Sequence, residues 1–485
     1  MLPLALAVTA FVPPQAQSQQ RCDVAIVGGG PGGIYFAWRL LKSGSDKSVC
    51  IYERSDRFGG RIYSLRKQGP KEDLVVDMGA YRYAPEPYVE PNSTWYVYTP
   101  LLGGLIDTEL KLPSVSYEPG DPTSTVRKIV DAEGQNAGYL TFVEALQDQL
   151  SAFEGYSMSF NQECVSIATG ADGRVVLSFA SGLSVSAAQV VLNVPQLPLL
   201  KILDRSESIL GASGGMPAAL QVPSPVDGVK LYVHYANAWW RNLLNLSSGE
   251  FGPNMHNATT IPLTQLPTLS GRYHDGHTRC DGPADAECRG YLEATYTYAT
   301  GARFFLNHEP SAEPPYTELT WGQPSGRFAL QMVHRVLIDY HKEALQNASK
   351  RLGLNATALV EGLRPDSALL SYWGPQTPGY GGAVHNTRPG PLLEEKDLAP
   401  LAMAPFGELP IYVANEAFGA LRGADGVLGG HHGWAECSLV MAENILATKF
   451  GVAPPTFVNE STYDEYVRFQ HAPEERARRG GWHQG

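Results

Sequence analysis

Several features are scarce or absent, and each absence excludes a class of protein. The 485-residue sequence has no apolar run of the roughly 20 residues that a transmembrane helix needs. It has no C-x-x-C pair, and its 12 histidines are scattered apart from His431 and His432, so we expect no metal site. Acidic residues outnumber basic ones and give a net charge of −12, which argues against a nucleic-acid or anionic-membrane partner. The length suits a globular protein with two domains or one large interrupted domain.

Cysteine is also scarce, at six residues, and fifteen pairings are open. Cys280 and Cys288 share a Gly/Pro/Asp-rich loop and are the expected local disulfide. Residues 1–20 have an apolar core that ends in small residues and a Pro/Gln-rich stretch. Although a basic n-region is missing, this pattern predicts a secretory signal peptide.

N-glycosylation sequons are more frequent than chance predicts. Because such sequons mark exposed loops of secreted proteins, we expect an N-glycosylated protein that is secreted or vacuolar. The six sequons are at Asn92, Asn245, Asn257, Asn347, Asn355 and Asn459.

A Gly-rich motif between two predicted strands is the strongest positive signal. Val24–Val27 is a short β-branched and apolar run, typical of a buried parallel strand, and G-x-G-x-x-G spacing follows at 28–33. Residues 34–42 carry apolar side chains at helical intervals, and a second strand, Val49–Tyr52, ends on Glu53. A G-x-G-x-x-G motif alone is weak evidence for a dinucleotide site, but here the strand, the helix and the terminal acid form one βαβ unit. The pattern favours a dinucleotide site over a structural turn.

Each residue of the motif has a predicted task. Gly28 permits the tight turn, Gly30 lets the backbone approach a pyrophosphate, and Gly33 lets helix and strand pack closely. The pyrophosphate would bind the free N–H groups at the helix N-terminus, and Glu53 would accept the ribose hydroxyls. Further cofactor contacts are expected from Pro31, Gly32 and Arg54.

The rest of the chain reads as short strands with a few helices. We expect irregular structure over residues 85–125, a long loop with two sequons between residues 235 and 291, and a frayed tail from about residue 465. The predicted strands are Leu74–Asp77, Cys164–Thr169, Arg174–Ala180, Leu183–Ser186, Gln189–Val194, Lys230–Tyr235, Tyr291–Ala299 and Ile411–Ala414. The predicted helices are Tyr139–Leu150, Phe328–Leu352 and Ala435–Phe450.

Four motifs in order carry a family resemblance: DVAIVGGGPGG, DRFGGR, MGAYR and YVANEAFG…GWAECSLVMAENIL. With them the chain resembles the flavin-dependent amine oxidases, and more narrowly the secreted L-amino acid oxidases of venoms and marine molluscs. The resemblance implies a mixed α/β fold with a Rossmann-like FAD-binding domain, assembled from separated segments, and a sheet-plus-helix substrate-binding domain. It also implies that the dinucleotide is FAD.

The resemblance implies a division of the chain into seven segments. After the signal peptide at 1–20, FAD-binding parts would occupy 21–82, 138–200 and 371–450, with the substrate-binding domain at 201–370 and a C-terminal tail at 451–485. Residues 83–137 would be a reduced irregular insertion. The family's long helical insertion over the active site is missing there, so we expect a wider access.

Further cofactor contacts are carried over by motif. Ala383 stands where some amine oxidases attach the flavin through a cysteine, so the FAD is expected to be non-covalent. Asn415 replaces the family's usual glycine before the acid that holds the ribityl chain. The contacts implied are Gly60 and Arg61 near the phosphates and flavin, Gly79, Ala80 and Tyr81 along the ring edge, Val165 at adenine, Glu416 at the ribityl chain, and Gly433, Trp434, Ala435 and Cys437 at the pyrimidine end.

Three residues are the expected catalytic groups, each with a structural alternative. Arg82 matches the arginine that grips a substrate carboxylate, and its alternative is a structural salt bridge. Lys230 matches a lysine bonded through water to flavin N5, and its alternative is a surface strand lysine. Trp434, with Gly433, matches the aromatic substrate cage, and its alternative is a core tryptophan. Where venom enzymes have a carboxylate-binding tyrosine this chain has Pro378, and Tyr380 is the expected substitute.

The sequence thus predicts an L-amino acid oxidase that passes hydride to FAD and electrons to oxygen, giving 2-oxo acid, ammonia and hydrogen peroxide. An amine or polyamine oxidase, a flavin-dependent isomerase or desaturase, and a binding protein that retains FAD structurally remain alternatives. The substrate side chain and the oligomeric state, including a homo-oligomer, are left open.

Overall fold

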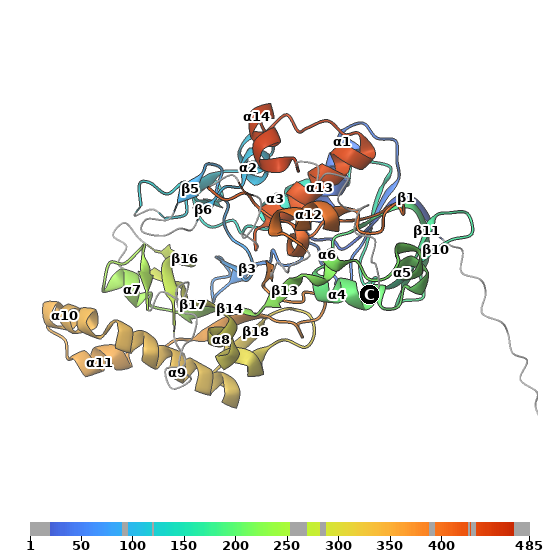
Figure 1. Ribbon diagram of the computed structural model, residues 1–485. Coiled ribbons are helices and arrows are strands. Elements are labelled where there is room, and N and C mark those ends of the chain that lie inside the picture. The colour runs from blue at the N-terminus through green and yellow to red at the C-terminus, as the bar shows by residue number, and fades with distance from the viewer. Residues whose placement is uncertain are drawn as a thin grey trace, which may run out of the picture.

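The computed structural model describes residues 20–89, 96–118, 121–252, 269–281, 288–387, 393–424, 427 and 433–469 (Figure 1). Residues 1–19 of the expected signal peptide, the sequons at Asn92 and Asn257, the pair His431 and His432, and most of the tail expected to be frayed lie outside these residues. Among the helices described, none is long and apolar enough to cross a membrane.

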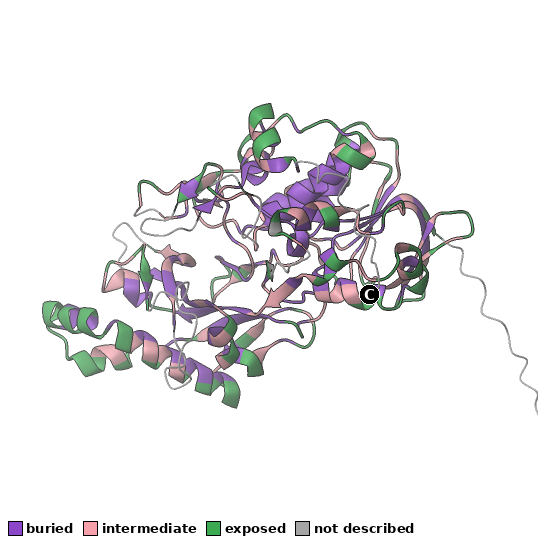
Figure 2. Ribbon diagram, viewed as in Figure 1, coloured by how far each residue is buried: buried purple, intermediate pink, exposed green. Residues whose placement is uncertain are grey.

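The βαβ unit forms as its sequence predicts. β1 (Gln20–Val27) pairs in parallel with β2 (Val49–Tyr52), and α1 (Pro31–Lys42) connects them. Gly30 caps the helix in extended conformation, and Pro31 follows at its first turn, where its missing N–H costs nothing. Most of α1 is buried because α3 (Thr141–Leu150) and α13 (Ala435–Phe450) pack against it (Figure 2).

A seven-stranded sheet surrounds this unit. Its order is β10-β11-β12-β1-β2-β9, with β21 paired to β12. The neighbours of β1 and β2 are parallel, whereas β10, β11 and β12 form an antiparallel meander. The mixed α/β class with a Rossmann-like core is therefore confirmed. The remaining strands are β9 (Tyr156–Ser159), β10 (Cys164–Thr169), β11 (Val175–Phe179), β12 (Ser184–Leu192) and β21 (Ile411–Val413).

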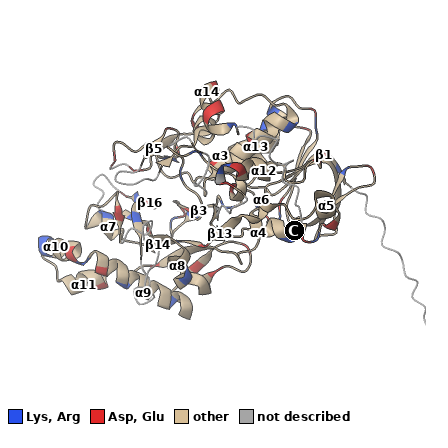
Figure 3. Cartoon of the chain, viewed as in Figure 1, with Lys and Arg blue, Asp and Glu red and all other residues tan. Residues whose placement is uncertain are grey.

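A second, six-stranded sheet is antiparallel and carries the other half of the site. Its order is β15-β16-β17-β14-β19-β18. The apolar face of α9 (Pro324–Tyr340) packs on it, and α10 (Lys342–Leu352) and α11 (Ala356–Glu361) extend outward with mixed charges (Figure 3). The strands are β14 (Gly228–Tyr235), β15 (Glu250–Phe251), β16 (Gly271–Cys280), β17 (Cys288–Tyr298), β18 (Thr317–Thr320) and β19 (Ser367–Trp373).

Shorter elements complete the fold outside the two large sheets. They are β3 (Ser64–Gln68), β4 (Leu74–Asp77), β5 (Tyr88–Val89), β6 (Tyr96–Val97), α2 (Pro100–Gly103), η1 (Gly104–Glu109), β7 (Ser114–Ser116), β8 (Arg127–Ile129), α4 (Gln196–Leu203), α5 (Glu207–Ser213), α6 (Ala218–Gln221), β13 (Pro223–Val226), α7 (Trp239–Asn242), α8 (Ala299–Ala302), η4 (Arg303–His308), β20 (Val384–Thr387), α12 (Glu395–Met403), η5 (Glu416–Phe418), α14 (Glu460–Thr462) and η6 (Tyr463–Val467).

Four local predictions were wrong. The strands expected at 183–186 and 189–194 are one strand, β12, because no turn separates them. The loop expected between residues 235 and 291 contains β16, and residues 85–125, expected to be irregular, contain the continuous helical stretch of α2 and η1. The helix expected over 328–352 breaks at His341 into α9 and α10.

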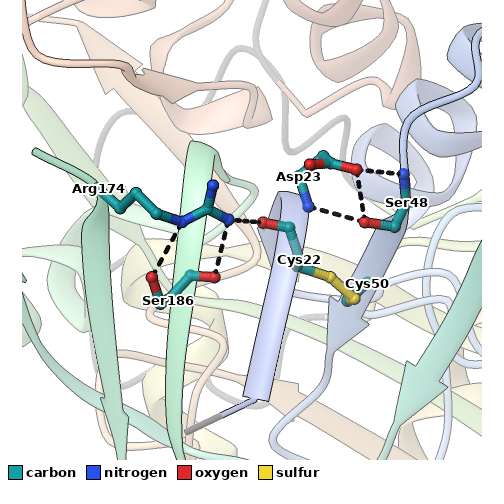
Figure 4. The surroundings of a disulfide bond; sticks show 6 residues. All are labelled: Cys22, Asp23, Ser48, Cys50, Arg174 and Ser186. Carbon is teal, nitrogen blue, oxygen red and sulfur yellow. Dashed lines mark hydrogen bonds between the residues drawn. A yellow bond between two sulfur atoms is a disulfide. The ribbon is translucent and has the colours of Figure 1, made fainter. Parts of the chain in front are cut away.

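Two disulfides are present. The expected bond between Cys280 and Cys288 joins the ends of β16 and β17 and is confirmed. A second bond, between Cys22 and Cys50, links β1 to β2 (Figure 4). The sequence did not single out this pair, because its members are 28 residues apart and meet only when the strands align. Cys164 and Cys437 are buried and take part in neither disulfide.

Candidate active site

The Gly-rich turn has the geometry of a phosphate cradle. Gly28 has a φ of +101°, and a Cβ there would lie 2.4 Å from the carbonyl oxygen of Asn193. A Cβ on Gly33 would lie 2.4 Å from the carbonyl oxygen of Gly28, which confirms the close strand–helix packing expected of that glycine. Both positions therefore require glycine for the packing of the turn itself, and this packing places Gly28, Gly30 and Pro31 on the cavity wall at the N-terminus of α1.

Glu53 is held in place at the end of β2. Its Oε2 accepts a hydrogen bond of 2.7 Å from the backbone N–H of Gly29. Its Oε1 accepts bonds of 2.8 Å from the N–H and hydroxyl of Ser55. These bonds fix the carboxylate beside the Gly-rich turn, where the sequence predicts the ribose.

Residues from three separate segments contact a second carboxylate, that of Glu416. Arg61 Nη2 donates to its Oε2 at 2.7 Å, and the N–H of Gly433 donates to its Oε1 at 2.7 Å. His385 Nδ1 lies 3.0 Å from Oε2. Sequence reasoning missed this histidine, because nothing in its local sequence connects it to Glu416.

One elongated cavity of about 290 Å³ runs between the two sheets. Asn193, Tyr296, Trp373 and Ser438 line it without having been predicted. Gly32, Gly33, Tyr81, Arg82 and Cys437 were predicted site residues but do not line it. The predicted residues that do line it are Gly28, Gly30, Pro31, Glu53, Arg54, Gly60, Arg61, Gly79, Ala80, Val165, Lys230, Tyr380, Glu416, Gly433, Trp434 and Ala435.

Side chains of the second sheet donate hydrogen bonds to the backbone of segment 77–79. Ser371 Oγ and Trp373 Nε1 both donate to the carbonyl of Met78, at 2.8 and 2.9 Å. Lys230 Nζ donates to the carbonyls of Asp77 and Gly79. The chain that leads to Ala80 and Arg82 is thereby fixed between the two sheets.

Lys230 is 2% exposed, so the surface-lysine alternative is excluded. It lines the cavity, and its Nζ lies 3.3 Å from the centre of the Tyr81 ring and 5.0 Å from that of Tyr296. Burial lowers the pKa of Lys230 to about 8. The ammonium group can therefore exchange a proton near neutral pH.

Arg82 lies next to the cavity, within a cage of aromatic rings. Its guanidinium carbon is 4.7 Å from the centre of the Tyr117 ring, 5.3 Å from Tyr81 and 5.9 Å from Trp434. Trp434 is half-buried, caps α13 and lines the cavity, so it is not a fully buried core tryptophan. Tyr117 was not predicted, because it lies in the insertion expected to be irregular.

Tyr380 does not replace the missing carboxylate-binding tyrosine. Its hydroxyl donates to Glu313 Oε1 at 2.8 Å and accepts from Arg57 Nη2 at 2.7 Å. A phenol has one proton, and here that proton is already used. Cys437 also departs from expectation: it is buried in α13, whereas the neighbouring Ser438 lines the cavity.

Comparison with known proteins identifies this arrangement. A family model described as flavin containing amine oxidoreductase matches residues 115–425, which is more than half of the chain. A NAD(P)-binding Rossmann-like domain matches residues 26–93. The chain belongs to the flavin-containing amine oxidoreductase family.

Individual relatives of this amine oxidoreductase match over short stretches. Aplysianin-A from Aplysia kurodai is 37% identical over 76 residues, which are 14% of this chain and 13% of the relative. Amine oxidase [flavin-containing] B from Homo sapiens is 43% identical over 65 residues, which are 13% of this chain and 12% of the relative. The matches thus span less than a fifth of these curated relatives. A solved putrescine oxidase triple mutant with redesigned cofactor binding covers 90% of this chain and 100% of its own at 14% identity, with a TM-score of 0.51, a likeness in fold alone.

The site of this amine oxidoreductase fits the predicted flavin cofactor. The N-terminus of α1, which has no side-chain cap, follows the Gly-rich turn, and Glu53 stands beside that turn. The cavity continues from there past Arg61 and Gly79 to Trp434 at the N-terminus of α13. A helix N-terminus there favours negative charge on the far end of the bound group. Family and fit together confirm the FAD prediction.

Proposed function

We propose that this amine oxidoreductase is a FAD-dependent oxidase of L-amino acids, which yields a 2-oxo acid, ammonia and hydrogen peroxide. FAD, bound without a covalent link, supplies the hydride acceptor and returns electrons to oxygen. The protein's own residues bind the amino acid, orient its Cα–H, exclude water and hold the protons.

The caged Arg82 is the observation that carries the proposal. Burial opposes its charge, but Tyr81, Tyr117 and Asp275 raise the pKa of Arg82 above its ordinary value, so the guanidinium stays charged. A planar guanidinium beside an aromatic-lined cavity matches a carboxylate in bidentate geometry. An amine substrate has no carboxylate and would gain nothing from this residue.

Lys230, Tyr296 and Trp434 surround the same end of the cavity. The Trp434 face excludes water and limits the positions open to the substrate. Lys230, held by two backbone carbonyls, orients a water or holds a proton at its Nζ. Together with Arg82 these residues fix both ends of a small amino acid.

An oxidase of amines or polyamines is the second candidate. The match to amine oxidase B favours it. Neither Pro378 nor Tyr380 supplies a second hydrogen-bond donor to a substrate carboxylate, which weakens the binding expected for an amino acid. The two candidates differ in one testable requirement, the substrate carboxylate.

Arg82→Met decides between them. The variant keeps the length of the side chain but loses its charge and its donors, so the substrate carboxylate loses its partner in a poorly hydrated site. We expect kcat/KM for the preferred L-amino acid to fall by about a hundredfold or more. Peroxide formation with a panel of L-amino acids and their decarboxylated amines measures this fall.

The exposed Arg303 supplies the matched control. Arg303→Met removes the same charge away from the cavity and should leave kcat/KM unchanged, and both variants should retain FAD. If the wild type oxidises the amine as well as the amino acid, or if Arg82→Met keeps full activity, the amine oxidase candidate replaces the amino acid oxidase.

We also propose that the protein is secreted and N-glycosylated. The sequon asparagines Asn245, Asn347, Asn355 and Asn459 are all exposed. Asn355 and Asn459 cap helices through Oδ1, which leaves the amide nitrogen free for a glycan. Protein produced through a eukaryotic secretory pathway should lose mass on treatment with peptide-N-glycosidase. An unchanged mass would contradict the proposal.

A further inference from the structure

A buried carboxyl group lies behind the lysine of the site. Glu293 belongs to β17 and has no exposed surface. The β14–β17 register shifts between Leu231 and Tyr232, and the shift places Glu293 opposite Tyr232. Tyr232 and Lys230 are two residues apart on β14 and therefore share a face of the sheet with Glu293.

The Tyr232 hydroxyl lies between two acceptors. Its oxygen is 3.0 Å from the carbonyl of Asp77 and 3.1 Å from Glu293 Oε2. A hydroxyl donates one proton, and a carbonyl only accepts. If Glu293 were ionised, Tyr232 could satisfy only one of the two. If Glu293 is protonated, it donates to Tyr232, and Tyr232 donates to Asp77, so both contacts become hydrogen bonds.

The charges nearby lead to the same protonation state. Asp275 Oδ2 is 3.6 Å from Arg272 Nη1, and neither Asp275 oxygen has a hydrogen bond. Glu293 Oε1 is 4.0 Å from the same Nη1 and is also without a hydrogen bond. One guanidinium therefore faces two buried carboxyl groups. Two buried anions that face the same nitrogen repel each other, and a single proton on the more distant carboxyl removes this repulsion.

The same carbonyl connects Glu293 to Lys230. The Asp77 oxygen accepts from both Tyr232 and Lys230, the latter at 3.3 Å. A proton on Glu293 thus orders the chain Glu293–Tyr232–Asp77 carbonyl and leaves the second lone pair of that carbonyl to Lys230.

We propose that Glu293 holds a proton in the working enzyme and is a positioning residue for Lys230, acting through Tyr232 and the Asp77 carbonyl. The inference rests on the proposed function only for what Lys230 does, and not for the protonation state itself. Burial and the neighbouring Asp275 raise the pKa of Glu293 to about 8, whereas the cations beside Asp275 hold the pKa of that carboxyl far below its usual range, although burial opposes this.

Every packed element contributes a charged or titratable neighbour to this cluster. They are Lys230 and Tyr232 from β14, Arg272, His274 and Asp275 from β16, Asp77 from β4, Tyr81 and Arg82 from the segment after β4, Tyr117 from the insertion, Lys128 from β8 and Tyr296 from β17.

Infrared spectroscopy tests the proton directly, without substrate. The carbonyl stretch of a carboxylic acid should be present at neutral pH in the holoenzyme and disappear in Glu293→Gln, so that the difference spectrum isolates this group. Asp275→Asn should make the same band disappear at a lower pH than in the wild type, because the neighbouring anion is removed while burial still favours the protonated form of Glu293. Glu250→Gln is the matched control: Glu250 also binds Arg272 but is half exposed to solvent, and its loss should leave the band.

Thermal unfolding as a function of pH gives an independent measurement. Between the ordinary pKa of 4.5 and the folded value of about 8, folded Glu293 binds a proton that the unfolded chain does not. The stability contributed by this group therefore falls as pH rises through that window. Glu293→Gln carries no titration, so it should gain in Tm relative to the wild type as pH rises.

The positioning role needs a readout at Lys230. In the wild type, ionisation of Glu293 at high pH adds a negative charge near Lys230. This charge stabilises the protonated form of the lysine. In Glu293→Gln this charge never forms, so the alkaline pKa of the kcat/KM profile should move to lower pH, by up to about one unit, with kcat at neutral pH kept because the amide mimics the acid. Tyr232→Phe, which breaks the chain but keeps both end groups, should also shift the profile.

The absence of a carboxylic acid band from the difference spectrum between wild type and Glu293→Gln, or equal pH dependence of Tm in the two proteins, would overturn the protonation. An unchanged alkaline pKa in both Glu293→Gln and Tyr232→Phe would overturn the positioning role. Because the first two measurements use no substrate, they are independent of whether the substrate is an amino acid or an amine.

Discussion

Ala383 has only a methyl group at the position where a cysteine would attach the flavin. Its carbonyl accepts a 3.0 Å hydrogen bond from Arg61 Nη1, and its Cβ would lie 2.5 Å from a Cβ on Gly228. The residue therefore contributes close packing and one backbone acceptor at the cavity wall, and no nucleophile.

The non-covalent flavin follows as a prediction. Acid precipitation of the purified yellow protein should release the flavin into the supernatant, because acid unfolds the cavity and nothing at Ala383 retains the ring. The absorbance of supernatant and pellet measures the release. Flavin that stays with the pellet would show attachment through another residue.

At Tyr380, the sequence alone was misleading. The position lies near the missing tyrosine, but its hydroxyl contacts Arg57, which is 323 residues away in the sequence. Such a partner is invisible to local reasoning. Lys230 shows the reverse case, since its burial between two sheets decides between a surface and a site residue.

At the scale of elements, the Cys22–Cys50 disulfide holds β1 against β2 at the ends opposite the Gly-rich turn (Figure 4). Asp23 accepts bonds from the N–H and hydroxyl of Ser48, at 2.9 and 2.8 Å, beside it. Arg174 Nη2 donates to the carbonyl of Cys22 at 2.6 Å. The start of the dinucleotide unit is thus fixed covalently and by hydrogen bonds.

Removing this disulfide should destabilise the FAD-binding sheet. The bond closes a separation of 28 residues, for which chain entropy gives a contribution of about 3–4 kcal/mol. The double variant Cys22→Ser and Cys50→Ser should lower the urea midpoint of unfolding and release FAD at a lower urea concentration, as flavin fluorescence reports.

The second disulfide is the control. Cys280 and Cys288 are separated by only 8 residues, for which the same reasoning gives about 2–3 kcal/mol. Their double serine variant should lower the midpoint less and leave FAD release unchanged. Equal effects of the two double variants on FAD release would contradict a specific role for the first bond.

The break between α9 and α10 shows why helix periodicity misleads. The apolar pattern continues through residues 328–352, but His341 Nδ1 contacts the Leu337 carbonyl at 2.6 Å, and its Nε2 lies 2.6 Å from the hydroxyl of Tyr273. This tertiary contact holds His341 at φ −102° and ψ 9°, outside the helical range. The apolar pattern predicted that the segment is helical, and the contact with Tyr273 on β16 decided where the helix breaks.

At the scale of the whole molecule, the cavity exists because two sheets meet across segment 77–79. Ser371 on β19 is buried and donates to the carbonyl of Met78, without lining the cavity itself. It therefore connects the second sheet to segment 77–79 from behind the cavity wall.

Ser371→Ala should weaken this connection. Losing the bond leaves a buried carbonyl with one donor fewer, at a cost of about 1 kcal/mol, so the dissociation constant of FAD should rise about fivefold. Equilibrium dialysis or flavin fluorescence measures the change. Ser349→Ala, compared in protein produced without glycosylation because Ser349 belongs to the Asn347 sequon, is the matched control: Ser349 on the far helix α10 is also buried and donates to the carbonyl of Leu354 just after that helix. It should cost similar stability without weakening FAD binding, and a similar loss of FAD in both variants would contradict the role of Ser371.

The sequence by itself determined the βαβ unit, the sequence positions of the Gly-rich turn and Glu53, and the family. These depend on short-range patterns: apolar runs of strand and helix length, glycines at fixed spacing, and motifs in a fixed order. The ends of β2, β10 and α13 were predicted to the residue, because turn and capping residues bound them.

The tertiary structure alone decided which side chains share protons and charges. Glu293 meets Tyr232 across 61 residues and, through it, the Asp77 carbonyl across 155 residues. These contacts depend on the shifted register between β14 and β17 and on the packing of one sheet against another. No local pattern encodes such a register, because it is set by the packing of all the strands together.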